Sequence, residues 1–373
     1  MAGLRAFVAE DVPAVSDLVW KVLHERQGPS PASLKTYFQE LFLQNPWHDE
    51  GIVSRVYEDG EGKVRGFFGA VPRRMTLQGK PVRMAFGSNF VLDPECRASM
   101  AAMQLVRTFM KGTQDVSITD SANENSRQML RSLGFTVVPV YSLLWARPLR
   151  PSLYGVHGVT RLKKNKLMAT LGAVAKPVCS VADSAAVMLP GSPFRQVRPT
   201  ATTGEELSTE TLLQCLQSMP SKQLLLPEYD LNSLDWVLQF VTKRKALGEV
   251  RRVLVRDKDK KAIGWFIYYV APGAVGEVLQ IGSDSPSVGK VLDHLFYDAW
   301  EQGLAGLHGR LEPQFMQELT QRSCFFLRNG SWTLVHSSKP EFLGPIQSGA
   351  AFFSRLDGEW PFRVDANRLV HES

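Results

Sequence analysis

The stretch of sequence that decides the fold is Ser88-Asn89-Phe90-Val91-Leu92-Asp93-Pro94-Glu95-Cys96-Arg97-Ala98-Ser99-Met100-Ala101-Ala102. Its first five residues form a short and mainly apolar run, which predicts a β-strand. Asp93 and Pro94 then predict a turn, and the small residues after Arg97 favour the start of a helix. The first turn of a helix leaves backbone N–H groups unpaired and carries the positive end of the helix dipole. The stretch therefore predicts a pocket for a phosphorylated cofactor.

The side chains at this turn suit a pyrophosphate. Arg97 supplies a permanent cation, and its planar fork of donors matches phosphate oxygens. Small side chains allow phosphates to approach the backbone, and the turn has four of them: Ala98, Ser99, Ala101 and Ala102. Met100 is the exception, because it is bulky where a glycine would fit best.

Further motifs stand on either side of this turn. The chain opens with Leu4–Val15, which reads as a strand, an acidic turn and an amphipathic helix, and it continues with Asn123-Glu124-Asn125-Ser126 and Leu133-Gly134-Phe135. In this order and spacing, the motifs resemble the acyl-CoA-binding core of the GNAT N-acetyltransferase superfamily over roughly the first 147 residues. The resemblance implies a mostly antiparallel twisted sheet flanked by helices. It also implies acetyl-CoA or another acyl-CoA as cosubstrate, and no metal.

The resemblance indicates which residues contact the cofactor. They are Phe90, Val91, Leu92, Arg97, Ala98, Ser99, Met100, Ala101, Ala102, Asn123 and Ser126. In this superfamily an asparagine at the position of Asn123 commonly faces the cofactor. The same side chain can cap the helix that follows it, and the two roles are compatible.

Two positions depart from the superfamily pattern. Met100 replaces the first glycine of the usual Arg/Gln-x-x-Gly-x-Gly/Ala turn, while Ala102 keeps the small final position. Leu130 stands four residues before the Gly-Phe pair, where many members carry a tyrosine that protonates the departing thiolate. Either another group or water serves as the acid, or the domain binds acyl-CoA without rapid turnover.

Acyl transfer from a thioester to an amine requires a deprotonated amine and a polarised carbonyl held in line. Asp120, at the end of a predicted strand, is the candidate general base, and Asn123 is the second candidate catalytic residue. Ser88, Asn89 and Asp93 lie near the expected cofactor. The alternative role of Asp93 is to shape the turn before the proline that follows it.

Hydrophobic periodicity extends this layout through the first half. It predicts helices at 11–25, 31–43, 98–112 and 123–133, and strands at 51–58, 64–74, 82–92, 115–120 and 135–146. Asp59-Gly60-Glu61-Gly62 predicts a hairpin turn.

The second half repeats the order of elements. Periodicity predicts helices at 208–218, 230–247, 287–302 and 313–322, and strands at 250–257, 262–271, 275–282, 305–311 and near 324–337. We therefore predict a mixed α/β chain with two GNAT-like domains in tandem, divided as 1–147, a linker with helical segments at 148–205, and 206–373.

The second copy is predicted to be degenerate. Ser285-Pro286-Ser287-Val288-Gly289-Lys290 stands at the cofactor turn but has no counterpart of Arg97-x-x-x-x-Ala102. Such a domain would have lost its cofactor and could shape an acceptor site instead. Glu277, Arg310 and Glu312 could line that site, although structural ion pairing is the favoured interpretation.

Composition sets the remaining limits. The 373 residues favour two domains, and 44% apolar with 21% charged residues is typical of a soluble globular protein. The net charge of +6 favours anionic partners such as CoA, lipid head groups, polysaccharide or RNA, but no nucleic-acid motif accompanies it and DNA is not an expected partner. Four separated cysteines and no apparent signal segment indicate the cytoplasm. The scattered histidines give no zinc motif.

Residues 161–176 begin with a basic run and continue into a mildly apolar one. A basic amphipathic element of this kind can touch an anionic membrane surface. A solvated linker helix is the favoured alternative, because the apolar part is weak.

The sequence thus predicts transfer of an acyl group, with acetyl expected, from acyl-CoA to an amine of a small-molecule or polymer-linked acceptor. One alternative is an aminoacyl-tRNA-dependent transferase, which the basic charge would suit but in which the Arg97 turn would be superfluous. Another alternative is a non-catalytic binding or scaffold protein, which Met100 and Leu130 would favour.

Overall fold

The computed structural model describes residues 3–96, 100–162, 179, 181–183, 185–186, 188–189, 191–218, 222–328 and 330–363. Arg97, Ala98, Ser99 and most of the predicted membrane-contact segment 161–176 lie outside this part of the chain. Within the described residues, every helix is too short or too polar to cross a membrane.

Helices and strands are interspersed along the chain, with β2–β4 and β10–β12 as runs of consecutive strands. The helices are α1 (Val12–Val22), α2 (Ala32–Phe38), α3 (Ala101–Met110), α4 (Glu124–Ser132), α5 (Pro151–Leu162), α7 (Thr209–Ser218), α8 (Leu231–Thr242), α9 (Val288–Glu301), α10 (Met316–Gln321) and α11 (Pro340–Gln347). The strands are β1 (Gly3–Ala6), β2 (Arg55–Glu58), β3 (Val64–Leu77), β4 (Lys80–Leu92), β5 (Val116–Ala122), β6 (Thr136–Val137), β7 (Leu143–Pro148), β8 (Thr202–Glu206), β9 (Leu225–Pro227), β10 (Glu249–Asp257), β11 (Ala262–Val270), β12 (Val275–Ser283), β13 (Gly306–Arg310), β14 (Phe325–Arg328) and β15 (Trp332–His336).

Local sequence signals explain where several elements begin and end. Pro13 stands in the first turn of α1, where its missing N–H has no intrahelical partner to lose. The Asp230 side chain accepts a hydrogen bond from the Ser233 N–H and caps α8. Asp59 closes the β2–β3 turn by accepting from the N–H groups of Glu61 and Lys63, as the predicted hairpin requires.

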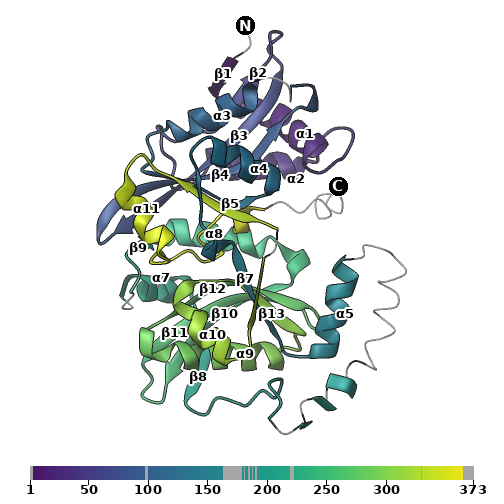
Figure 1. Cartoon of the computed structure of the whole chain (residues 1–373), viewed down its shortest axis with the longest axis vertical. Coiled ribbons are helices and arrows are strands. Elements are labelled where there is room, and N and C mark those ends of the chain that lie inside the picture. The colour runs from purple at the N-terminus through teal and green to yellow at the C-terminus, as the bar shows by residue number, and fades with distance from the viewer. Residues whose placement is uncertain are drawn as a thin grey trace.

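The strands form two mixed sheets with the same strand order. The first sheet runs β1-β2-β3-β4-β5-β15-β6, with β9 added beside β3, and the second runs β8-β10-β11-β12-β13-β7-β14. Each is antiparallel except for one parallel pair, which is β4–β5 in the first and β12–β13 in the second. Figure 1 shows the two sheets as an upper and a lower layer. The predicted fold class is confirmed.

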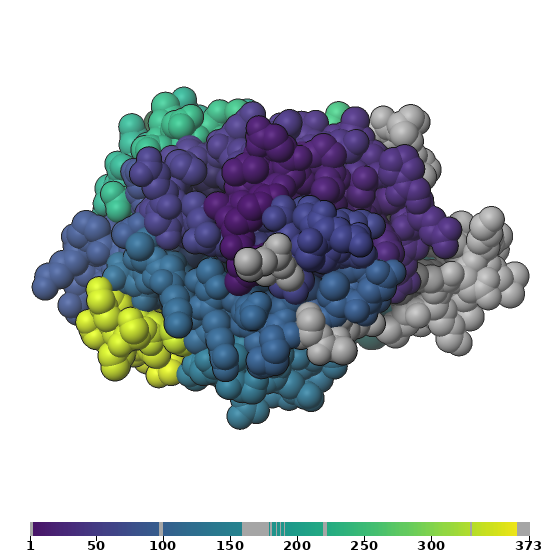
Figure 2. Space-filling view, turned by 90° about the horizontal axis from the view of Figure 1, so that it is seen from above, coloured from purple at the N-terminus to yellow at the C-terminus, as the bar shows by residue number. Residues whose placement is uncertain are grey.

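The two sheets exchange a strand. β7 follows the elements of the first sheet but pairs with β13 and β14 in the second, while β15 follows the second-sheet elements and pairs with β5 and β6 in the first. Seen from above, a patch from the C-terminal part, yellow in Figure 2, lies beside blue and teal residues of the first half. The predicted boundaries 1–147, 148–205 and 206–373 stay a prediction. β7 crosses the first of them, and β15 lies within 206–373 but belongs to the first sheet.

Most predicted elements are confirmed, one predicted strand is wrong, and the elements β8, β9 and α11 were not predicted. The predicted strand 135–146 is wrong, because this segment forms β6, a short 3-10 turn at Val140–Ser142 and then β7 in the other sheet. The end of the predicted linker forms β8, which pairs with β10. Neither a two-residue strand nor a polar edge strand produces a clear hydrophobic alternation.

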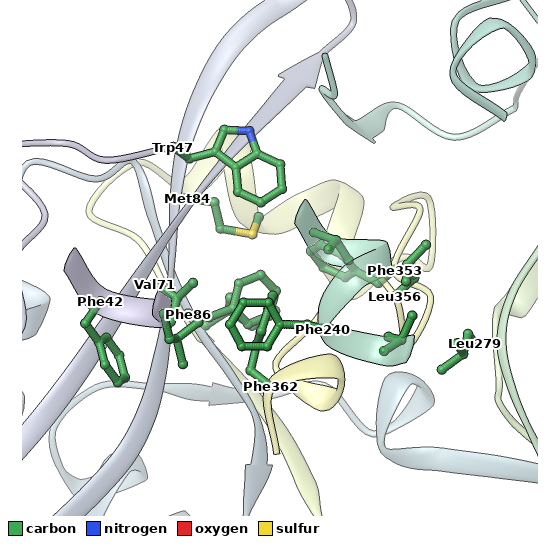
Figure 3. Close-up of a cluster of buried hydrophobic side chains, with 14 of the residues drawn as sticks. Phe42, Trp47, Val71, Met84, Phe86, Phe240, Leu279, Phe353, Leu356 and Phe362 are labelled. Atoms are coloured by element: carbon green, nitrogen blue, oxygen red, sulfur yellow. The ribbon is translucent and has the colours of Figure 1, made fainter. Parts of the chain in front are cut away.

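Alternating side chains divide each sheet between two buried clusters. On β11, Trp265, Ile267 and Tyr269 face an inner cluster, whereas Phe266 and Tyr268 face an outer one that includes α9 and α10 residues. The inner cluster is shared by both sheets. It joins residues such as Phe86 of β4 and Leu279 of β12, with Leu356 and Phe362 of the C-terminal segment (Figure 3). The two sheets are therefore held together by a common core rather than by a surface contact.

Arg73 is an unpaired cation inside this core. Its side chain is 4% exposed, and Nε, Nη1 and Nη2 have no hydrogen-bond partner within the described residues. The guanidinium lies between the rings of Trp47 and Phe362, 4.1 and 5.0 Å from their centroids. Burial lowers the pKa of Arg73. Aromatic faces offset only part of the desolvation of a buried charge.

We expect Arg73→Met to stabilise the protein. Methionine is shorter, but it is flexible and apolar and can fill part of the space beside the two rings without desolvating a charge. The free energy of unfolding should rise by about 1–2 kcal/mol, as when buried charges are replaced by apolar groups of similar volume. Urea unfolding at pH 7.5 measures the change, and a loss of stability would show that Arg73 has a counter-charge in solution.

Candidate functional site

β4 and β5 part at the centre of the first sheet. Met84–Phe86 of β4 pairs with Val116–Ile118 of β5. Beyond this pairing, β4 continues to Leu92 and β5 continues to Ala122. A cavity of about 460 Å³ lies where they separate. Its walls on this side come from the ends of the two strands, namely Gly87, Ser88, Asn89, Phe90, Thr119, Ser121 and Ala122.

A bulge in β4 shapes the same opening. The β3–β4 register shifts between Phe67 and Gly69, and Asn89 adopts a left-handed backbone with φ of 51°. Asparagine is one of the few residues besides glycine that tolerates this conformation. The Asn89 amide donates to Tyr37 Oη at 2.7 Å and to Ser88 Oγ at 3.0 Å, which fixes the bulge. β-Bulges often re-aim side chains beside functional sites.

The second half of the chain completes the cavity. The remaining wall contains Arg244 and Leu247 after α8, Glu277 of β12, and the C-terminal residues Arg355, Glu359, Trp360, Phe362 and Arg363. The first half supplies mainly hydroxyl, amide and apolar groups, whereas most of the charged side chains come from the second. The cavity is thus a shared site between the two sheets.

Glu359 joins the two separated strands. Ser88 Oγ of β4 donates to Glu359 Oε1 at 3.0 Å, and the Ser121 hydroxyl of β5 donates to Oε2. The residue is 7% exposed. A carboxylate is therefore held at the point where the ladder opens, with each oxygen anchored to a different strand.

The environment of Glu359 tunes its acidity. Burial, followed by the nearby charge of Asp120, raises its pKa to about 7, against the smaller opposing effects of Arg363 and the two serine hydroxyls. A carboxylate with a pKa near neutrality can exchange protons at physiological pH. This property matches the requirements of a general base.

A hydrogen-bonded turn follows Glu359 at the cavity. The following residues Trp360–Phe362 form a 3-10 turn, and Arg244 Nη1 donates to the Trp360 carbonyl at 2.8 Å. The Arg244 guanidinium also lies 4.2 Å from the Trp360 ring centroid. Gly358 allows the approach, because a Cβ there would lie 2.1 Å from Asp120 Oδ2.

Asp120, the predicted general base, lies near the end of β5 but not in the cavity wall. It alternates with Thr119 and Ser121 on β5, and only those two neighbours line the cavity. Its buried carboxylate forms an ion pair with Arg310 and accepts from the Glu359 N–H at 3.3 Å. Burial alone would raise the pKa of Asp120, but the Arg310 and Arg363 charges outweigh it and the pKa is lowered. This geometry favours a positioning role for Asp120, and it makes Glu359 the second candidate for the base.

Several predicted cofactor contacts do lie at the cavity. Phe90, Asn123 and Ser126 line it, and Asn123 Oδ1 accepts from the Ser126 N–H at 2.9 Å as the cap of α4. Leu130 and Phe135 line it too, so the position of the superfamily tyrosine faces the site with an apolar side chain.

The other predicted contacts are not in this wall. Val91 is buried in the inner cluster, Ala101 is buried, Leu92 and Ala102 are half-buried, and Met100 is 54% exposed where α3 begins. Arg97, Ala98 and Ser99 lie outside the described residues.

Asp93 shapes the turn. It accepts from the Glu95 N–H at 3.1 Å and approaches Lys21 and Arg65 at 3.4 and 3.3 Å. These bonds support its turn-forming role rather than a role in the chemistry.

The corresponding opening in the second sheet is occupied by the chain itself. Val275–Val278 of β12 pairs with Gly306–Gly309 of β13. Beyond that point, the Leu356 N–H donates to the Leu279 carbonyl at 3.0 Å. Gln280 Nε2 lies 3.3 Å from Asp357 Oδ2 and 3.4 Å from Ser354 Oγ. These contacts favour the interpretation that the second half has lost a cofactor site of its own.

The three second-half candidates have separate surroundings. Glu277 lines the shared cavity and pairs with Arg355, while Arg310 pairs with Asp120. Glu312 is buried outside the cavity wall, and burial raises its pKa to about 8. Ion pairing is thus observed for Glu277 and Arg310.

No protein-family model matches the chain, and no curated protein is detectably similar to it. Solved structures do share its fold. A GCN5-related N-acetyltransferase from Anabaena variabilis ATCC 29413 superposes with a TM-score of 0.58 at 12% identity, covering 91% of this chain and 74% of that one. A probable N-acyltransferase from Enterococcus faecalis V583 gives 0.56 at 12% identity, with 90% and 73% covered.

A third structure, Saccharomyces cerevisiae N-myristoyltransferase with bound myristoyl-CoA and inhibitors, gives a TM-score of 0.52 at 12% identity and covers 90% of this chain and 79% of that one. At such low identities these likenesses show the fold. The chain has the GNAT fold over most of its length, as the sequence motifs predict.

Proposed function

We propose that this protein is an acyl-CoA-dependent N-acyltransferase whose shared cavity holds the thioester between β4 and β5. The observation that carries the proposal is the Glu359 carboxylate, anchored by Ser88 and Ser121 at the point where the strands part. The GNAT fold supports it, since the solved structures with this fold include N-acetyl- and N-myristoyltransferases.

Each part of the cavity has a role in the proposed reaction. The amine lone pair attacks the thioester carbonyl carbon, the carbon–sulfur bond breaks, and the amine proton passes to Glu359. Strand edges that have left their ladder offer backbone N–H groups, which can stabilise the developing oxyanion. Leu130 cannot donate a proton, so water is proposed to protonate the departing thiolate.

The proposed donor is acetyl-CoA, with its pyrophosphate at the Arg97 turn. The proposed acceptor is an amine of a small molecule or of a polymer. It would enter beside Glu277, Arg355 and Arg363, the charged side of the cavity. We also propose a cytoplasmic location, where acetyl-CoA is available, because the cysteines are widely separated in the sequence.

Calorimetric titration with acetyl-CoA and with CoA tests the proposed donor. We expect micromolar affinity for the unmodified protein and at least tenfold weaker binding for Arg97→Glu, which places a negative charge beside the pyrophosphate (about 1.4 kcal/mol or more). Lys258→Glu is the matched control, because it makes the same charge change at an exposed turn.

Two results would argue against this donor. If neither ligand binds, the acyl-CoA assignment fails and salt-sensitive tRNA binding becomes the next measurement. If both variants weaken binding equally, the effect is one of overall charge and the Arg97 turn is not the pyrophosphate site.

A further inference from the structure

Arg147 of β7 is a buried cation with incomplete pairing. It is 6% exposed, and its Nη2 donates to the Pro193 carbonyl while Nε has no hydrogen-bond partner in the described chain. No ion pair joins it to a carboxylate among the described residues. Buried charges in proteins are normally paired. An anion at this place would therefore complete its surroundings.

A cleft of about 530 Å³ lies beside Arg147. Four other basic residues line it, namely Arg195, Arg198, Lys290 and Arg322, with one acidic residue, Asp293. Asp293 is bonded to Arg322 at 2.6 and 3.0 Å, so this pair is already neutralised. The remaining cations give the cleft an excess of positive charge without a matching carboxylate in its wall.

We propose that this cleft binds a small anion carrying at least two phosphate groups. One guanidinium group can donate to two phosphate oxygens at once. Arg147 supplies such a group from inside the cleft. The hydroxyls of Ser192, Thr200 and Ser323 also line the cleft and offer further donors. The spread of three arginines and a lysine around one cleft suits a diphosphate better than a single phosphate.

The site is separate from the shared cavity and is not a second copy of it. Its walls come from β7, the segment 192–202, α9 and the end of α10. Of the stretch Ser285–Lys290, which corresponds in order to the first-half cofactor turn, only Lys290 lines it. Binding here therefore does not depend on the proposed acyl-CoA site.

Titration of the full chain with inorganic pyrophosphate, and with inorganic phosphate for comparison, tests this proposal. Lys290→Glu and Arg195→Glu, both at exposed positions, should each weaken pyrophosphate binding by at least about tenfold. Arg147→Met should abolish binding while leaving a folded protein, because it removes a buried unpaired charge. Phosphate should bind at least about tenfold more weakly than pyrophosphate.

Two further variants separate this site from others. Lys258→Glu controls for the charge change, and Arg97→Glu removes the cation of the proposed acyl-CoA turn. Both should bind pyrophosphate like the unmodified protein. Absence of pyrophosphate binding, unchanged affinity in Lys290→Glu and Arg195→Glu, or loss of binding only in Arg97→Glu would each overturn the proposal. Thermal unfolding of every variant confirms that a loss of binding is not a loss of folding.

Discussion

Glu359→Gln is expected to lower kcat/KM for acyl transfer by about 10²–10⁴-fold, the usual contribution of a positioned general base. Glutamine keeps the shape of the side chain and can accept the Ser88 hydrogen bond, but it cannot take a proton from the amine. The measurement is the release of CoA from acetyl-CoA at pH 8, with an amine acceptor identified by screening.

The pH dependence separates this role from a structural one. Because the pKa of Glu359 is raised to about 7, kcat/KM of the unmodified protein should rise with pH and level off above that value. Glu359→Gln should lack this rise. Ser121→Ala removes one anchor but keeps the base, so it should retain the pH-dependent rise at a lower rate. A variant Glu359→Gln with an unchanged rate would contradict the assignment.

The same shift makes a prediction about stability. The folded pKa is raised above the ordinary value of 4.5, so the folded protein binds the Glu359 proton more tightly than the unfolded chain does. The contribution of Glu359 to the free energy of unfolding therefore falls as the pH rises from about 4.5 to about 7. Relative to the unmodified protein, Glu359→Gln should gain stability over that window, which urea unfolding at several pH values can follow.

Arg310→Met is expected to destabilise the protein by about 3–5 kcal/mol, because it leaves the Asp120 carboxylate buried without its partner. The Asp120 side chain is fully buried and that of Arg310 is 9% exposed, so water cannot replace the lost bonds. This ion pair also joins β5 of the first sheet to β13 of the second. Urea unfolding at pH 7.5 gives the free energy.

Two controls identify the cause. Arg256→Met breaks a pair with Glu205 at 2.7 Å whose side chains are 31% and 50% exposed, so it should change stability by no more than about 1 kcal/mol. Combining Arg310→Met with Asp120→Leu should recover most of the loss, because neither charge of this pair is then left buried without its partner. Equal losses for Arg310→Met and Arg256→Met would show that the buried pair contributes no more than a surface pair.

The sequence predicts the helices and strands better than it predicts which strands pair with each other. Alternation on β11 and the turn at Asp59 are local signals, and the structure confirms them. β7 shows the limit, because the run Leu143-Leu144-Trp145-Ala146 is apolar enough for a strand but does not specify which sheet it joins. Strand partners are chosen by packing over long separations, and the shared inner core makes the exchange of β7 and β15 possible.

The candidate site shows a similar division. Asn123, Ser126 and Phe90 belong to a recognisable motif and do lie at the cavity. Glu359 belongs to none, and it reaches Ser121 across 238 residues of sequence. The only local signal is that this acidic residue directly precedes the apolar run Trp360-Pro361-Phe362. That position suggests that Glu359 is buried, but it does not indicate which residues it contacts.

A crystal structure of the protein soaked with CoA would show directly whether the parted strands β4 and β5 receive the thioester. We expect the CoA thiol between Ser88 and Ser121, close to the Glu359 carboxylate, with the pyrophosphate at the turn that follows β4. CoA bound between β12 and β13, or away from both openings, would contradict it.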